Sequence, residues 1–342
     1  MPDKAPANRF RIVCQIILAT LFSSGAAMAQ GLSSSCDMGE LATVSLTFTD
    51  DQRPLMDASI NGNLVSAMVN IGSAQTTILN KKTLDRFGIK VNHVTSSNYR
   101  KERDSSGDII PTNMIEVREG FNALVKNYAA GRTRGKNMWF VVEDFMDDTF
   151  GARIGAGTLL QTDLELDLDA GHLKYFKPDG CFREHLAYWD PKAVAVNVSA
   201  DVWKRDPRPI FRITINGNEA WALLSTATPH SYLPASAAGP LGLAATSAGA
   251  TREEPLPGHD QSTPVWNVPV AQMSVGGLEV KDFSLRLMDL PHSGELVILG
   301  ADFLQRHRVY IAKSQGQMYF SRVENPTPKR GSVKVIPQPI DF

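Results

Sequence analysis

Residues 60–73 of this chain read Ile-Asn-Gly-Asn-Leu-Val-Ser-Ala-Met-Val-Asn-Ile-Gly-Ser, and residues 215–228 read Ile-Asn-Gly-Asn-Glu-Ala-Trp-Ala-Leu-Leu-Ser-Thr-Ala-Thr. Both segments begin with the same four residues and continue with a mostly apolar stretch. Asn61 and Asn216 are 155 positions apart, and so are Asn70 and Ser225. Two copies at a fixed spacing indicate two copies of one structural unit, and such a repeat determines the architecture of a chain.

Each copy shows two further patterns. The Asn-Gly pair predicts a two-residue hairpin turn, and the apolar residues after it predict a strand that ends at Asn70 or Ser225. Late in each copy comes an apolar stretch with glycine: residues 154–160 read Ile-Gly-Ala-Gly-Thr-Leu-Leu, and residues 298–304 read Ile-Leu-Gly-Ala-Asp-Phe-Leu. Gly155 and Gly300 are 145 positions apart.

These patterns together resemble the two lobes of the aspartic peptidases, in the bacterial branch with retropepsin-like lobes. In that family each lobe carries an apolar strand that ends in Asp-Thr-Gly-Ser/Thr/Ala. Later in each lobe, an apolar-apolar-Gly sequence passes next to the catalytic turn, and its glycine permits a close backbone approach. The resemblance covers about residues 40 to 322. It implies an all-β fold of two retropepsin-like (acid protease) β-barrel lobes in tandem, which 20 prolines and 26 glycines also favour.

The resemblance divides the chain into five parts. We expect a signal peptide over residues 1–29, lobe one over 38–186, a linker over 187–209, lobe two over 210–323 and a Pro-rich tail over 324–342. A flap hairpin, which covers the substrate in the family, is expected in lobe one with its tip near residues 104–108.

Both positions at which the family has its catalytic acids are changed in this chain. The resemblance places Asn70 and Ser225 there. An aspartic peptidase needs two carboxylates that share one proton, one as the base on a water and one as the proton donor. An amide cannot accept a proton near neutral pH, and a serine hydroxyl is far too weak an acid. We therefore predict that no catalytic residue is intact, which favours a chain without peptidase activity over an active peptidase.

The residues after these two positions differ from the family in part. Ile71 removes the threonine hydroxyl that links the lobes, whereas Thr226 keeps it. Gly72 is retained, and Ala227 replaces its partner. The hydroxyls of Ser73 and Thr228, which brace the acids in the family, are both present. These six residues form the predicted cleft between the lobes.

The N-terminus predicts export. Lys4, Arg9 and Arg11 precede a mostly apolar stretch over residues 12–28, and Ala27-Met28-Ala29 fits a cleavage site after Ala29. We therefore expect a periplasmic or secreted protein without a membrane span after cleavage. An uncleaved membrane anchor, or a lipid anchor at Cys36, is the alternative. The net charge of −1 argues against nucleic acid as a partner.

The mature chain would keep two cysteines, Cys36 and Cys181, in an oxidising compartment. They lie before the first strand and after the last strand of the first repeat, and we expect a disulfide between them. Two buried free thiols are the alternative.

The sequence suggests no other chemistry. The histidines are scattered without a metal-binding pair, so we expect neither a metal nor another cofactor. Ser225 and His230 lack the Gly-x-Ser-x-Gly turn of a serine hydrolase. For four acids near the cleft strands we expect turn-capping and solvent-facing positions: Asp163, Asp167, Asp169 and Asp302.

Three functions are compatible with these observations. The first is a pseudoprotease that binds an extended peptide or protein segment in the inter-lobe cleft without cutting it. The second is an active aspartic-type endopeptidase with an atypical site, using a relocated acid such as Asp302. The third is a structural envelope or assembly protein that makes its contacts through the tail.

Overall fold

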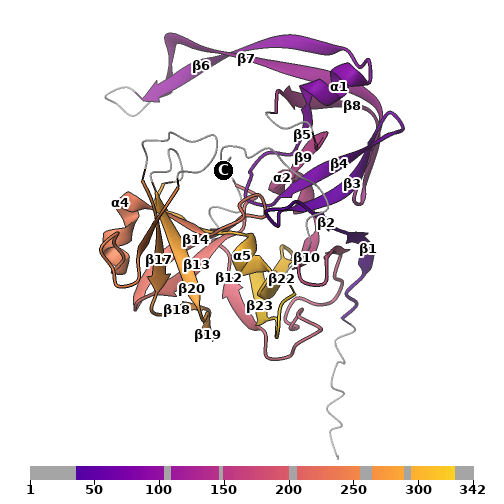
Figure 1. The fold of residues 1–342 in the computed structure, drawn as a ribbon. Coiled ribbons are helices and arrows are strands. Elements are labelled where there is room, and N and C mark those ends of the chain that lie inside the picture. The colour runs from indigo at the N-terminus through magenta and orange to yellow at the C-terminus, as the bar shows by residue number, and fades with distance from the viewer. Residues whose placement is uncertain are drawn as a thin grey trace, which may run out of the picture. The chain divides into compact units, whose positions relative to one another are not determined.

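The computed structural model describes residues 36–103, 109–145, 149–199, 206–254, 264–288 and 294–327. The predicted signal peptide, the predicted flap tip at 104–108 and most of the predicted tail lie outside these residues. Within them the all-β prediction is confirmed, because strands dominate and the longest helix, α1 (Lys81–Arg86), has six residues (Figure 1). None of the helices in these ranges is long and apolar enough to cross a membrane.

The elements of the first repeat, in chain order, are β1 (Glu40–Ser45), β2 (Thr47–Phe48), β3 (Pro54–Ile60), β4 (Asn63–Asn70), β5 (Thr77–Asn80), α1, β6 (Val91–Arg103), β7 (Ile109–Ala130), β8 (Thr133–Glu143), β9 (Ala152–Gly155), α2 (Ala156–Leu159), β10 (Asp163–Asp167) and β11 (His172–Phe176).

Those of the second repeat are β12 (Val194–Asn197), β13 (Ile210–Ile215), β14 (Asn218–Leu224), β15 (Tyr232–Pro234), α4 (Ala235–Ala238), η1 (Gly239–Leu241), β16 (Thr251–Glu253), β17 (Val265–Val270), β18 (Met273–Val275), β19 (Leu278–Glu279), β20 (Phe283–Met288), β21 (Val297–Leu299), α5 (Ala301–Leu304), β22 (His307–Ala312) and β23 (Gln317–Arg322).

The first repeat forms a closed barrel. Its eight-stranded sheet has the order β2-β3-β4-β9-β5-β8-β7-β6, and β3 pairs with β7 as well as with β4. The strands β3, β4, β9, β5, β8 and β7 therefore form a closed ring. The predicted turn joins β3 to β4, with Asn61 and Gly62 at φ values of 52° and 87°, the positive values that a type I′ turn requires. β6 and β7 continue beyond the ring as a long hairpin (Figure 1).

The second repeat has the same strand order. Its nine-stranded sheet contains β20-β15-β21-β14-β13, which corresponds to β8-β5-β9-β4-β3. β17 pairs with β20 and β18 pairs with β13, so these two strands occupy the place of β7. The correspondence between the two repeats extends to individual hydrogen bonds. Asn61 and Asn127 exchange a reciprocal pair of hydrogen bonds, and Asn216 and Gln272 exchange the equivalent pair.

A six-stranded sheet, in the order β1-β11-β10-β22-β23-β12, joins the two repeats. Its two halves come from different repeats and meet where β10 pairs antiparallel with β22. β12 thus takes the place in the second repeat that β1 has in the first. It lies within the segment 187–209, which sequence reasoning describes only as a linker. The apolar residues of Val194–Asn197 pair with β23, so this part of the segment is a strand and not a free connector.

The two glycines of the apolar-apolar-Gly sequences lie where another backbone comes very close. A Cβ on Gly155 would be 2.2 Å from the Gln75 carbonyl oxygen, and a Cβ on Gly300 would be 2.5 Å from the His230 carbonyl oxygen. In both repeats the next residue, Ala156 or Ala301, donates its N–H over 2.8 Å to a carbonyl in the turn after β4 or β14. Only glycine fits at such a distance, and the predicted close approach is confirmed.

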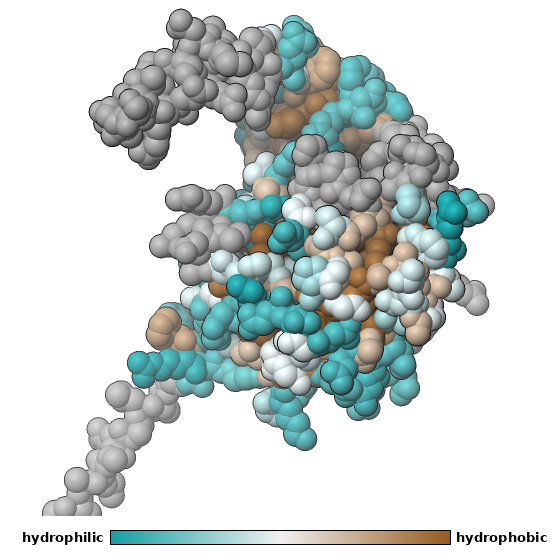
Figure 2. All heavy atoms as spheres, turned by 90° about the vertical axis from the view of Figure 1, so that its left-hand side faces the viewer, coloured by the Kyte–Doolittle hydropathy of each residue, from teal (hydrophilic) through white to brown (hydrophobic). Residues whose placement is uncertain are grey.

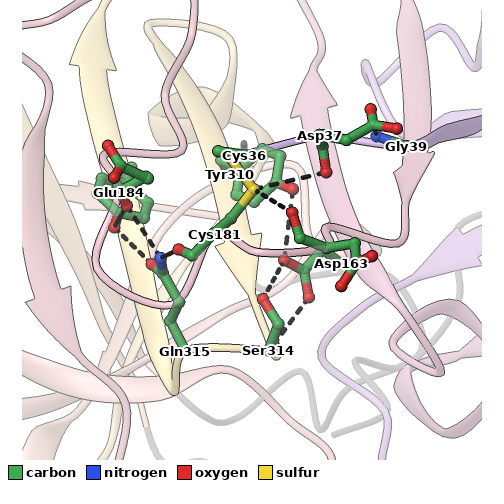
Figure 3. The surroundings of a disulfide bond; sticks show 11 residues. Cys36, Asp37, Gly39, Asp163, Cys181, Glu184, Tyr310, Ser314 and Gln315 are labelled. Carbon is green, nitrogen blue, oxygen red and sulfur yellow. Dashed lines mark hydrogen bonds between the residues drawn. A yellow bond between two sulfur atoms is a disulfide. The ribbon is translucent and has the colours of Figure 1, made fainter. Parts of the chain in front are cut away.

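The predicted disulfide between Cys36 and Cys181 is present, with Cα atoms 4.6 Å apart. Figure 3 shows how the turn between β22 and β23 reaches this region. Gln315 Nε2 donates to the carbonyl oxygens of Cys181 (2.7 Å) and Glu184 (2.9 Å). The neighbouring Ser314 donates its N–H and hydroxyl to the Asp163 carboxylate at 2.8 and 2.7 Å. The disulfide-bonded end of the first repeat is therefore tied to the second repeat.

Candidate functional site

The turns that follow β4 and β14 meet between the two repeats. Asn70 ends β4, and Ser225 directly follows β14. The hydroxyl of Thr226 joins the turns: it donates to the Val69 carbonyl oxygen (2.5 Å) and accepts from the Ile71 N–H (3.0 Å). Ile71 returns no such bond because its side chain is apolar. Of residues 71 and 226, only Thr226 therefore bonds the other turn through its side chain.

Gly72 lies directly against Ser225. A Cβ on Gly72 would be 2.8 Å from both the Cβ and the Oγ of Ser225. Atoms cannot approach so closely without displacement, so any larger residue at position 72 would push the two turns apart. On the other side of the junction, Ala227 packs against a cluster from the first repeat that includes Ile78 and Phe145. Both small residues therefore allow the turns to pack together.

Asn70 and Ser225 are buried and polar, with exposed fractions of 3% and 0%. Neither the Asn70 Oδ1 nor the Ser225 Oγ has a hydrogen-bond partner among the residues that the structure describes. Buried polar atoms are normally satisfied, and one without a partner calls for an explanation such as a bound ligand.

The two expected bracing hydroxyls contact other atoms: Ser73 Oγ accepts from the Gln75 N–H, and Thr228 Oγ1 lies 3.5 Å from the Ser225 carbonyl oxygen.

Asn70 lines a pocket of about 130 Å³ in the first repeat. Its charged lining residues are Glu143, at the end of β8, and Arg153, in β9, which form an ion pair. The Arg153 guanidinium also lies over the Phe145 ring, 4.3 Å from its centroid. Sequence reasoning missed both charged residues because strand pairing brings them to Asn70 from distant positions, and neither belongs to a recognisable motif.

Asp302, the acid that the relocated-acid hypothesis names, acts as a cap. Its carboxylate accepts the N–H and hydroxyl of Ser231 at 2.9 and 2.7 Å and the N–H of Phe303 at 2.7 Å. Burial raises the pKa of Asp302, and the bonds from Ser231 oppose this rise. His230 lies 3.9 Å from Asp302, and burial lowers the pKa of this histidine. His230 therefore faces an acid in its own repeat, and the Ser225 hydroxyl makes no bond to it.

The acids of β10 are buried, so the expectation that Asp163 and Asp167 face solvent is wrong. Asp163 is 2% exposed and accepts the bonds from Ser314 described above. Asp167 is 7% exposed, and its Oδ1 accepts the Ala170 N–H in the turn after β10, which agrees with a capping role. Asp169, in the same turn, accepts the Thr327 N–H at 2.8 Å. Asp163 is covered by Tyr310 and Ser314 of the second repeat, and Asp167 lies beside Arg308.

Glu165, Asp167 and His172 bring their side chains close enough together to hold a metal ion. The two carboxylates of this group are already paired with Arg308 from β22. Its guanidinium donates to Glu165 at 2.7 Å and lies 3.4 Å from Asp167. Burial pushes the pKa of Glu165 upward, but hydrogen bonds from His172 and Tyr188 and the charge of Arg308 hold it below the ordinary value. The group is an ion-pair network across the two repeats, in which Arg308 contacts both carboxylates and balances one of their two negative charges.

Comparison with protein families agrees with the fold. The family model of aspartyl proteases matches residues 211–303, which include the turn after β14 and the Gly300 sequence. No curated protein matches the chain. The match supports an aspartic-protease-like family for this chain. It covers the second repeat only, and the architecture of the first repeat follows from the shared strand order.

Proposed function

We propose that this protein is a catalytically inactive, exported member of the aspartic-protease-like group that binds an extended peptide or protein segment between its two lobes. One observation carries this proposal. Both catalytic-type turns are kept and packed against each other, whereas Asn70 and Ser225 stand where the acids are expected. An amide and a hydroxyl can hold a ligand by hydrogen bonds, but they cannot exchange the proton that hydrolysis requires.

The relocated-acid alternative has less support. The Asp302 carboxylate is held by Ser231 and Phe303 on the side of its own repeat, and no described bond links it to Asn70 or Ser225. The Glu165 carboxylate is neutralised by Arg308. A peptidase using either acid would have to break these contacts before it could activate a water.

Export and a cleaved signal remain part of the proposal. The disulfide between Cys36 and Cys181 supports them, because structural disulfides persist in oxidising compartments. Mass spectrometry of the protein recovered from its host would give the mature N-terminus, which we expect at Gln30.

The central test uses the chain from Gln30 onward with a diverse peptide library from acid to neutral pH. Products are identified by mass spectrometry, and peptides retained after gel filtration are identified in parallel. We expect no cleavage, and we expect retained peptides that the Asn70→Ala, Ser225→Ala double variant no longer holds. Cleavage that the parent shows and the double variant loses would refute the inactive assignment. Cleavage that only Asp302→Asn abolishes would establish the relocated-acid alternative. Absence of both cleavage and retention would favour a structural role.

A further inference from the structure

One face of the first barrel runs from Asn70 to an exposed apolar strip. Residues in register on neighbouring strands project to the same face of a sheet. Met68, Arg153, Ile78 and Val141 lie in register across β4, β9, β5 and β8. Asn70 lies two positions after Met68, so its side chain projects to this face as well.

The apolar strip consists of Leu124, Trp139 and Val141. Leu124 lies opposite Trp139 in the β7–β8 pair, and Trp139 is two positions before Val141. Their exposed fractions are 39%, 60% and 54%, whereas Met68 and Ile78 in the same face are buried. Figure 2 shows hydrophobic surface gathered at the top of that view, the level at which β7 and β8 lie in Figure 1. An exposed group of large apolar side chains on one face indicates an interaction surface.

The pocket at Asn70 separates the strip from the turn, and its polar lining includes two acceptors that a ligand could use, beside the donors of Ser73, Gln75 and Thr76. Glu143 follows Val141 by two positions, and its side chain is 38% exposed. The Arg153 side chain is only 13% exposed and is engaged by Glu143 and the Phe145 ring. The other acceptor is the buried Asn70 Oδ1, which has no partner among the described residues. A ligand entering here meets the Glu143 carboxylate, which keeps accessible surface although Arg153 pairs with it, and the amide oxygen of Asn70.

We propose that this pocket binds the cationic group of a basic peptide residue, and that the apolar residues of the same peptide lie on the strip. The inference rests on the proposed function, since it specifies which peptide the site holds. A positively charged donor satisfies Asn70 Oδ1 and complements Glu143, and charge-assisted hydrogen bonds are stronger than neutral ones. A volume of about 130 Å³ has room for an ammonium or guanidinium group, and most of the residues that line it are polar. The cation can belong to a lysine or arginine side chain or to a free N-terminus.

The test uses a fluorescein-labelled, N-acetylated decapeptide of alternating alanine and leucine with one central lysine. Fluorescence anisotropy gives its Kd and the Kd of peptides with glutamine or glutamate in place of lysine. We expect the lysine-to-glutamine change to weaken binding about fivefold, the value for a partly exposed ion pair, and glutamate to weaken it more. A glutamine peptide with a free N-terminus distinguishes the two sources of the cation, because it regains affinity only if an α-amine enters the pocket.

Variants of the protein complete the design. Glu143→Gln is expected to remove the preference for lysine. Asp144→Asn is its matched control, because it makes the same charge change at the next residue, whose side chain is 65% exposed and does not line the pocket. Trp139→Ser is expected to weaken the lysine and glutamine peptides equally, about tenfold, because it removes an aromatic contact and no charge. If Glu143→Gln fails to fold, the Kd values of the lysine, glutamine and glutamate peptides for the parent protein still test whether the pocket prefers a cation.

The outcomes separate this inference from the proposed function. Peptides that bind equally with lysine, glutamine and glutamate would overturn the inference and leave the proposed function intact. A library in which no peptide binds would overturn both. Self-association in sedimentation experiments that Trp139→Ser abolishes, without peptide binding, would show that a second copy covers the strip and would also overturn the inference.

Discussion

Replacing Thr226 by valine tests whether one hydroxyl holds the two repeats together at the candidate site. Valine has nearly the shape of threonine but lacks the hydroxyl that bonds the Val69 carbonyl oxygen and the Ile71 N–H. Position 226 is fully buried, so water cannot replace the lost partner. The substitution would leave two buried backbone groups without hydrogen bonds.

The expected size follows from these two groups. An unsatisfied buried donor or acceptor costs about 1–3 kcal/mol. Two of them, partly relaxed by movement of the turns, give an expected loss of about 3 kcal/mol in the free energy of unfolding. Thr226→Ser is the matched control, because it keeps the hydroxyl and loses one methyl group, at a cost of about 1 kcal/mol.

Urea unfolding followed by circular dichroism measures both variants against the parent, with the disulfide intact in all three. Thr226→Val should unfold at a clearly lower urea concentration than Thr226→Ser, with an unchanged slope. Equal losses in the two variants would refute the reasoning, because they would show that the hydroxyl contributes no net stability. Lost peptide binding in Thr226→Val with retained binding in Thr226→Ser would further link this bond to the arrangement of the site.

Three further predictions concern the frame around the site. The double variant Cys36→Ser, Cys181→Ser opens a loop that spans 145 residues and should lose about 4–5 kcal/mol on the chain-entropy model, measured by urea unfolding; an unchanged midpoint would contradict it. Burial lowers the pKa of His307 to about 4, below the value of about 6.5 in the unfolded chain. The unfolded chain therefore binds a proton first as the pH drops. The free energy of unfolding should be highest above pH 6.5 and should fall by about 3 kcal/mol as the pH approaches 4. His307→Phe should flatten this part of a stability–pH curve, and the same slope in the variant would argue against the assignment. Gly300→Ala should cost more than about 2 kcal/mol because its Cβ meets the His230 carbonyl oxygen, whereas Gly239→Ala, with no atom nearby, should change the melting temperature little.

The local features of the fold could be predicted from the sequence because short segments encode them. The Asn-Gly turns, the strands ending at Asn70 and Ser225 and the two close-packed glycines all follow from adjacent residues and from the repeat. The Cys36–Cys181 pair could be predicted because only two cysteines remain after the predicted signal.

The features that were missed depend on pairings between distant strands. β12 is a short apolar run in a Pro-containing segment, and only its pairing with β23 makes it a strand. Asp163 and Asp167 alternate with leucines as exposed residues would, yet side chains of the second repeat cover them. Glu143 and Arg153 reach the Asn70 pocket through the parallel pairing of β5 with β8 and the antiparallel pairing of β5 with β9. A single sequence carries no signal for such register.

The proposal that Asn70 and Ser225 stand in place of two acids also bears on how the two turns stay packed together. Asn70 and Ser225 have almost no exposed surface at this junction. Two carboxylates in such a place would suffer a large desolvation penalty, which an enzyme accepts because catalysis requires it. Asn70 and Ser225 avoid this penalty, and the contacts of Thr226, Gly155 and Gly300 do not involve their side chains. Because these contacts, and not the acids, hold the turns together, a chain that lost catalysis would keep the geometry of the site, which remains available for binding.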